Sequence, residues 1–157
     1  MMTQFLHEMR LTCFSSINDS LLMWGHYANR HHGICIEYNT KDPIFVAVEK
    51  VKYTNVLPKL KINTLSDLKH ESLTQQFIKN ICTKEIRWNY ENEYRLFDIT
   101  RSGIYKLLPG SVNSIYMGLF CSLEDEGKIR KALSYQSVRY YRIELNTIKY
   151  KIEFYEV

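Results

Sequence analysis

The sequence predicts an α+β fold in which one mixed, mostly antiparallel sheet is accompanied by about three helices. The first observation is size and composition, because 157 residues, 45% hydrophobic and 24% charged, suit one compact domain. The second is a set of three segments with helical patterns, and the third is alternation of apolar and polar residues near the C-terminal end. We therefore expect a single domain over residues 1–157.

The first third of the chain predicts a strand, a buried helix and two more extended runs. Residues 10–15 are expected to be extended, and side-chain oxygens at residues 18–20 can cap a helix over residues 20–30. Apolar residues cover most of this helix, so we expect it to be largely buried. Gly33 fits the left-handed position that ends a helix. Extended runs follow at residues 34–38 and 45–53.

The remainder predicts a long helix, three strands, a short helix and a hairpin. The long helix is expected over residues 66–83 and the short, Ser-capped one over residues 122–133. Alternation over residues 148–154 predicts a half-buried strand. A two-residue link joins it to residues 138–145, which gives a C-terminal β-hairpin of about residues 137–156. The other expected strands cover residues 93–99, 104–108 and 112–117.

Charge and cysteine content narrow the classes of partner. Lys and Arg total 21 against 17 Asp and Glu, but the basic residues are scattered. This balance allows a small-molecule or nucleotide ligand and does not indicate nucleic-acid binding. The four cysteines form no C-x-x-C pair, which predicts reduced, buried thiols in a cytoplasmic protein and no metal site. No apolar run approaches the roughly 20 residues of a membrane span, so no membrane partner is expected.

Six short motifs, rich in aromatic and charged residues, occur in order along the chain. They resemble the uncharacterised, mainly bacterial family called domain of unknown function 2971, with a family-like core over about residues 11–133. Members usually begin with a further segment, so the resemblance implies a shortened member or a site that lacks that segment. The motifs are Cys13-Phe14-Ser15, Met23-Trp24-Gly25-His26-Tyr27-Ala28, Gly33-Ile34-Cys35-Ile36-Glu37-Tyr38, Val51-Lys52-Tyr53, Lys84 with Trp88-Asn89-Tyr90-Glu91-Asn92-Glu93-Tyr94-Arg95, and Ile115-Tyr116-Met117-Gly118.

The candidate reactive group is a carboxylate beside a guanidinium. Glu93 and Arg95 are two apart on an expected strand and therefore point to the same side, with Glu91 joining them if the strand starts early. Such a pair in a cleft could orient a sugar hydroxyl or hold a phosphate. The alternative is a partly buried ion pair that locks a strand edge.

Further candidates lie on the first helix and in the Lys84 segment. His26 could donate a proton near neutral pH, or it could be a core histidine with both nitrogens satisfied. Aromatic rings could stack on a nucleobase or a nicotinamide ring, or they could anchor the core. With His31 and His32, His26 does not form a shared helix face, so no metal site is expected. The predicted catalytic residues are Glu93, His26 and Arg95, and the predicted ligand-binding residues are Trp24, Tyr27, Lys84, Trp88 and Glu91.

Two functions from different classes stay open. P-loop, Rossmann, α/β-hydrolase and zincin motifs are all absent. The order of the motifs is similar in layout to the ADP-ribosyltransferase fold, which implies an NAD-using enzyme with Glu93 as its key carboxylate. The alternative is a non-catalytic ligand- or partner-binding module, of a kind used in bacterial defence or conflict systems. A nuclease is disfavoured because carboxylates at metal-binding spacing are not evident.

Two structural expectations accompany these functions, one on the core and one on the site. Trp24, Tyr27, Trp88 and Tyr94 are expected to be mostly buried. The first helix is expected to pack against the strand at residues 93–99, which would bring His26 into one cleft with Glu93 and Arg95.

Overall fold

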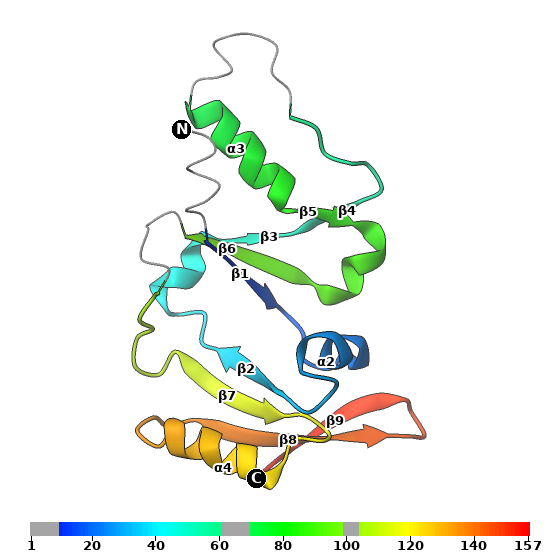
Figure 1. Cartoon of the computed structure of the whole chain (residues 1–157), viewed down its shortest axis with the longest axis vertical. Helices are drawn as coiled ribbons and strands as arrows, with labels where there is room; N and C mark the ends of the chain where they lie inside the picture. Colours follow the sequence, from blue (N-terminus) through cyan, green and yellow to red (C-terminus); the bar gives the residue numbers. More distant parts are fainter. Residues whose placement is uncertain (1–9, 61–69, 99–103) are drawn as a thin grey trace. The chain divides into compact units, whose positions relative to one another are not determined.

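The computed structural model describes residues 10–60, 70–98 and 104–157, and the chain divides into two compact units (Figure 1). Unit 1 comprises Met1–Ser16 and Ala47–Gly103, and unit 2 comprises Ile17–Val46 and Ile104–Val157. Each unit is therefore assembled from two separate stretches of chain. The expectation of one domain over the whole chain stays a prediction.

Unit 1 is built around a three-stranded antiparallel sheet. Strand β6 (Glu93–Asp98) lies in its centre, between β1 (Arg10–Ser15) and β3 (Val48–Lys50). The register places Arg95 opposite both Cys13 and Glu49. A second, parallel pair consists of β4 (Lys52–Thr54) and β5 (Thr83–Glu85). Helix α3 (His70–Ile81) leads into β5, and the 3₁₀ helix η3 (Ile86–Glu91) connects β5 to β6.

Unit 2 is built around a four-stranded sheet in the order β2-β7-β8-β9. The pairing of β7 with β8 is parallel, and the other two pairings are antiparallel. Helix α2 is capped by Ser20, and helix α4 is capped by Ser122, whose hydroxyl accepts from Asp125 N. The elements are α2 (Leu21–Tyr27), β2 (Ile34–Tyr38), η1 (Pro43–Ala47), β7 (Val112–Met117), α4 (Leu123–Ala132), β8 (Arg139–Asn146) and β9 (Lys151–Glu156).

Two apolar clusters stabilise unit 2. One contains Trp24, Ala28, Ile143 and Ile152, and the other contains Ile115, Met117 and Cys121. Because β7 is central in the sheet, its side chains on both faces are covered, which explains why it contributes the most deeply buried residues.

The α+β class is confirmed, and most strands and helices lie where the sequence predicts them. The main difference from the prediction is the number of sheets. The described strands form three sheets, whereas the sequence predicts one mixed sheet. The long predicted helix is confirmed over His70–Ile81, and its expected start lies outside the described residues. Within the described ranges, the helices are too short or too polar to cross a membrane.

The prediction of a long, largely buried first helix is wrong. Helix α2 ends at Tyr27 because the next residues leave helical geometry, with positive φ at Asn29, Arg30 and His31. Within α2 only Trp24 is buried. Gly33 does not adopt the predicted left-handed backbone conformation. A glycine suits this position for another reason, because a Cβ would lie 3.0 Å from the Ala28 carbonyl oxygen.

Two predicted strands are absent or shorter than predicted where a side-chain oxygen accepts hydrogen bonds from backbone N–H groups. Residues 104–108 are mostly exposed and belong to no strand, and Asp42 accepts from Leu108 N at 3.0 Å. In the C-terminal hairpin, Asn146 Oδ1 accepts from the N–H groups of Ile148 and Lys149. This turn leaves Ile148 exposed, so the alternation begins later than predicted.

Two further predictions need correction. The extended run over residues 45–53 is interrupted, because Pro43–Ala47 form a 3₁₀ helix and two short strands follow it. All four cysteines carry free thiols, but burial is confirmed only for Cys82 and Cys121. Cys13, on the edge strand β1, is exposed, and Cys35 is half-buried.

Candidate functional site

Four charged side chains meet in unit 1 and form the charge cluster: Lys84, Glu91, Glu93 and Arg95. They come from β5, η3 and β6, which are consecutive along the chain. The two carboxylates are almost completely covered, with 3% of the Glu91 side chain and 7% of the Glu93 side chain exposed. Two positive and two negative charges are therefore held together in a poorly solvated place.

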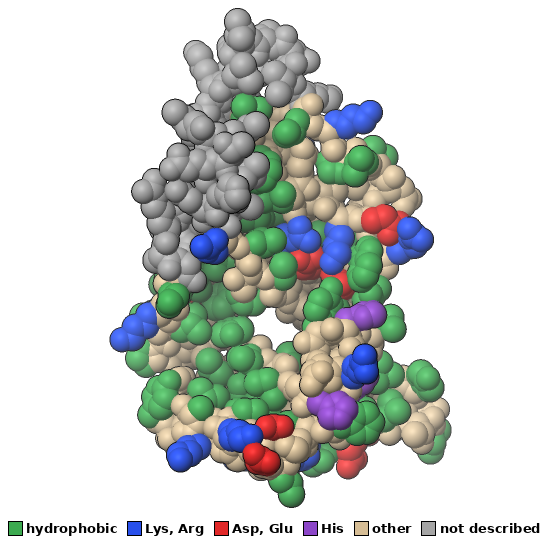
Figure 2. Space-filling model, viewed as in Figure 1, with side chains coloured by type: hydrophobic (Ala, Val, Ile, Leu, Met, Phe, Trp, Pro, Cys, Tyr) green, Lys and Arg blue, Asp and Glu red, His purple; other side chains and the backbone are tan. Residues whose placement is uncertain are grey.

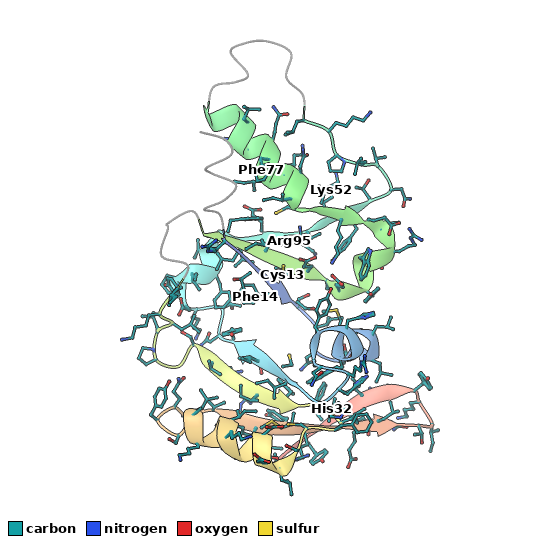
Figure 3. All side chains as sticks on the ribbon, in the orientation of Figure 1. Cys13, Phe14, His32, Lys52, Phe77 and Arg95 are labelled. Carbon is teal, nitrogen blue, oxygen red and sulfur yellow. The ribbon has the colours of Figure 1, made fainter. Side chains whose placement is uncertain are left out.

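Glu93 and Arg95 form the predicted same-face pair. Arg95 Nε donates to Glu93 Oε1 at 2.7 Å, and Arg95 Nη2 donates to Oε2 at 3.0 Å. This is the bidentate geometry that a planar guanidinium favours with a carboxylate. The remaining Arg95 nitrogen, Nη1, donates to the carbonyl oxygen of Ile81 at the C-terminal end of α3. Arg95 therefore connects the central strand to the end of the helix (Figure 3).

Lys84 bridges the two carboxylates. Its ammonium donates to Glu93 Oε2 at 3.1 Å and also to Glu91 Oε2. The same nitrogen lies 4.9 Å from the centre of the Trp88 ring, a distance typical of a cation–π contact. Lys84 is thus held by two charges and one aromatic face.

Backbone contacts fix the strand start that carries the carboxylates. Tyr53 Oη accepts from Glu93 N at 2.9 Å, and Ser15 Oγ donates to the Glu91 carbonyl at 2.6 Å. Asn92, between the two acids, adopts the left-handed conformation that ends η3. Our sequence reasoning missed Ser15, Tyr53 and the Ile81 carbonyl. The signal for the first two was available, because each ends one of the short motifs.

The contacts within the cluster favour the charged forms of Glu93, Lys84 and Arg95. Burial raises the pKa of Glu93, but hydrogen bonds from Arg95, Cys13 and Lys84 outweigh burial and lower this pKa to about 2. Burial lowers the pKa of Lys84, and its bonds to Glu91 and Glu93 reverse that effect, so the pKa is raised. On the face drawn in Figure 2, acidic side chains likewise lie next to basic ones.

The Cys13 thiol is unsuited to nucleophilic chemistry. Its pKa is raised to about 11, first by partial desolvation of the thiol, although the residue as a whole is exposed, and then by its hydrogen bond to the Glu93 carboxylate. A thiolate is the reactive form, so Cys13 is overwhelmingly a neutral thiol at pH 7.

The geometry limits what Glu93 can do. A carboxyl group with a pKa of about 2 carries no proton at neutral pH and cannot serve as a general acid. Both of its oxygens already accept from cations. What the arrangement does directly is join β5, η3, β6 and the end of α3.

The predicted residues of the first helix lie in the other unit. Trp24 is 3% exposed, and its Nε1 donates to the Asn18 carbonyl at 2.7 Å. His26 makes an edge-to-face contact with Tyr27, with ring centres 6.2 Å apart. Since these residues belong to unit 2 and the charge cluster belongs to unit 1, convergence of His26 on Glu93 stays a prediction. Packing of this helix on the Glu93 strand stays a prediction for the same reason.

The expected burial of four aromatic residues is only partly confirmed. Trp24 is buried and Tyr94 is half-buried, but Tyr27 and Trp88 are 63% and 40% exposed. Tyr27 is the last residue of α2, and Trp88 lies on a short 3₁₀ helix, where its ring contacts Lys84 and Tyr90. Neither position faces a core. Within the described residues, no group of three or more His, Cys, Asp or Glu side chains could hold a metal ion.

Comparison with known proteins returns one family. A family model described as "Protein of unknown function (DUF2971)" matches residues 23–96. The match contains the helix α2 motif and the Lys84 to Arg95 segment, and the predicted resemblance is confirmed over this range. It does not reach the motifs at Cys13 and Ile115. No curated protein and no solved structure matches the chain.

Proposed function

The chain belongs to the DUF2971 family over residues 23–96, and from that premise we propose that it is a non-catalytic ligand- or partner-binding module. In this proposal the charge cluster is a scaffold that positions a binding surface. A family of unknown function supplies no activity of its own, so the support comes from the contacts of Glu93.

The observation that carries the proposal is that both oxygens of the Glu93 carboxylate already accept hydrogen bonds from protein cations. Arg95 donates to both of its oxygens, and Lys84 donates to Oε2. A carboxylate that stabilises a developing positive charge must turn its negative charge toward the reacting atoms. Here that charge faces two protein cations, and 7% of the side chain is exposed. This arrangement supports a structural use of Glu93.

An ADP-ribosyltransferase-like enzyme that uses NAD is the second candidate. Two observations favour it: Glu93 opens a strand, as the layout of that fold requires, and its low pKa keeps it anionic. On this alternative Glu93, Arg95 and His26 would be catalytic, and Trp24, Tyr27, Lys84, Trp88 and Glu91 would bind the ligand. It also requires the two units to bring His26 to Glu93.

The experiment that separates the two functions is incubation of the purified chain with NAD and cell lysate, read by mass spectrometry. We expect neither release of nicotinamide nor an ADP-ribose adduct from the wild-type chain. Glu93→Gln should lower stability by about 3 kcal/mol. The control Glu85→Gln, at an exposed ion pair with Arg87, should lower it by less than about 1 kcal/mol. Nicotinamide release that Glu93→Gln abolishes in a folded protein would replace our proposal with the enzyme.

The proposal includes a bacterial, cytoplasmic setting. The family resemblance favours a bacterial source, and the four free thiols suit a reducing compartment. A role in defence or conflict systems belongs to the same proposal. Labelling of the cysteines in intact and lysed cells would test the compartment, because thiols in the cytoplasm react only with a membrane-permeant reagent.

A further inference from the structure

A groove in unit 1 lies beside the charge cluster and shares no side chain with it. It has a volume of about 370 Å³ and opens to solvent. Its walls come from one face of α3 and from the neighbouring strands β3, β4 and β5. The lining residues are Glu49, Lys50, Lys52, Gln75, Ile78, Lys79, Cys82 and Thr83, and we call this site the lysine groove.

Three lysines from three different elements line this groove together with one carboxylate, Glu49. The Lys50 ammonium lies 5.8 Å from the centre of the Tyr94 ring, at the edge of the groove, so Lys52 and Lys79 are its main cations. Lys50 lies on β3, Lys52 on β4 and Lys79 in the last turn of α3. Among the described residues, no carboxylate lies within 4.0 Å of any of these three ammonium groups. Lys84 and Lys128, in contrast, each contact two acidic side chains. The residues that line the groove therefore carry an excess of positive charge, with Glu49 as their one carboxylate.

The wall that carries Lys79 is fixed to the strands by backbone contacts. Lys52 N donates to the Cys82 carbonyl at 2.8 Å, and Cys82 N donates to the Ile78 carbonyl at 2.8 Å. Arg95 holds the neighbouring Ile81 carbonyl, so the charge cluster anchors the end of α3 (Figure 3). The Lys52 and Lys79 attachment points are thus held in one arrangement before any ligand binds, which lowers the entropic cost of binding.

We propose that the lysine groove binds a phosphate-bearing small molecule through a diphosphate or similar group with at least two negative charges. This inference rests on the proposed binding function and names the ligand class for it. Lysine ammonium groups act as point charges that suit phosphate oxygens. The volume is within the range of small-ligand sites, and the buried Cys82 thiol with Ile78 gives the floor an apolar part. Glu49 opposes the anion and sets an upper limit on affinity.

Isothermal titration calorimetry of the full chain with pyrophosphate, ADP and inorganic phosphate at low salt tests this inference. Lys52→Gln and Lys79→Gln should each weaken pyrophosphate binding, on the order of fivefold per lysine. Lys50→Gln should weaken it less, because the Lys50 ammonium lies over the Tyr94 ring. Glu49→Gln should strengthen it by a similar factor, a gain that misfolding cannot mimic. The matched control Lys149→Gln, at an exposed turn of unit 2, should leave binding unchanged. Affinity should fall as salt is raised.

The outcomes are separable from those of the NAD experiment. Binding of pyrophosphate that follows this pattern supports the groove, and tighter binding of ADP identifies a nucleotide as the source of the phosphates. Absence of binding by all three anions, or binding that the groove variants do not change, overturns the inference. Nicotinamide release would overturn the proposed function while leaving the anion titration to stand on its own result.

Discussion

The two units are stabilised by different means. Both apolar clusters found among the described residues belong to unit 2, where Ile115 and Met117 are almost completely buried. Unit 1 instead places ionised groups next to its central strand, with Glu91 and Glu93 as covered as core residues. Unit 2 also buries a charged group, Glu126, which pairs with Arg130 and Arg142. We therefore infer a contrast between two regions: the apolar cluster around Trp24 responds mainly to changes in side-chain volume, and the charge cluster around Glu93 responds mainly to changes in charge.

The largest expected loss of stability comes from removal of the core tryptophan Trp24, compared with removal of Trp88. Trp24→Ala should lower the free energy of unfolding by about 3–5 kcal/mol, because it empties the centre of an apolar cluster. Trp88→Ala removes a ring that is 40% exposed, with its contacts to Lys84 and Tyr90, and should cost about 1–2 kcal/mol. Chemical denaturation followed by circular dichroism measures both. Equal losses would end the distinction between a core and a surface tryptophan.

Removal of one charge from unit 1 is the next largest effect. Glu93→Gln keeps the shape of the side chain but leaves Arg95 and Lys84 without their shared anion, at a cost of about 3 kcal/mol. Glu85→Gln disrupts an exposed pair and should cost less than about 1 kcal/mol. Denaturant titration of both variants checks the difference. A Glu93→Gln chain as stable as the parent would contradict the role given to charge in unit 1.

Acid sensitivity should follow from the same carboxylate. Because the pKa of Glu93 is lowered from 4.5 to about 2 on folding, its stabilising effect is complete above pH 4.5 and is lost as the pH falls from 4.5 toward 2. The wild-type chain should therefore lose more stability over this interval than Glu93→Gln does. Thermal melts at several pH values between 6 and 2 measure the two slopes. Parallel slopes would show that Glu93 titrates alike in the folded and unfolded chain.

The smallest effect concerns the hydrogen bond that fixes the start of β6. Tyr53→Phe removes the oxygen that accepts from Glu93 N and should cost about 1 kcal/mol. The charge cluster itself remains, so the pH dependence should stay that of the wild-type chain. Denaturant titration at two pH values distinguishes this variant from Glu93→Gln. A changed pH slope would mean that Tyr53 holds the carboxylate as well as the backbone.

Local patterns predicted part of this account. The spacing of Glu93 and Arg95 places both on one side of a strand, and their bidentate pair follows from that. The ion pairs of Lys84 with the two carboxylates depend on the 3₁₀ helix η3 and on the parallel pairing of β4 with β5. The paired strands β4 and β5 lie far apart in the sequence. No local period encodes such a pairing.

The errors have physical causes in particular side chains. Asn146 accepts two backbone N–H groups and turns the chain where alternation predicted a strand. Asp42 does the same for Leu108, whose segment the sequence also predicted as a strand. The burial of aromatic residues was overestimated because Tyr27 and Trp88 lie at the end of one helix and on a 3₁₀ helix, not on a core-facing side.

The central claim is that the Glu93 carboxylate stabilises the folded chain through its ion pair with Arg95. A double-mutant cycle tests this claim most directly. The free energy of unfolding would be measured for the wild-type chain, Glu93→Gln, Arg95→Gln and the double variant at neutral pH. Each single substitution leaves a charge without its main partner, whereas the double variant does not. We predict that the double variant loses less than the sum of the single losses, with a coupling of about 1.5 kcal/mol or more. Losses that add within about 0.5 kcal/mol would contradict the claim.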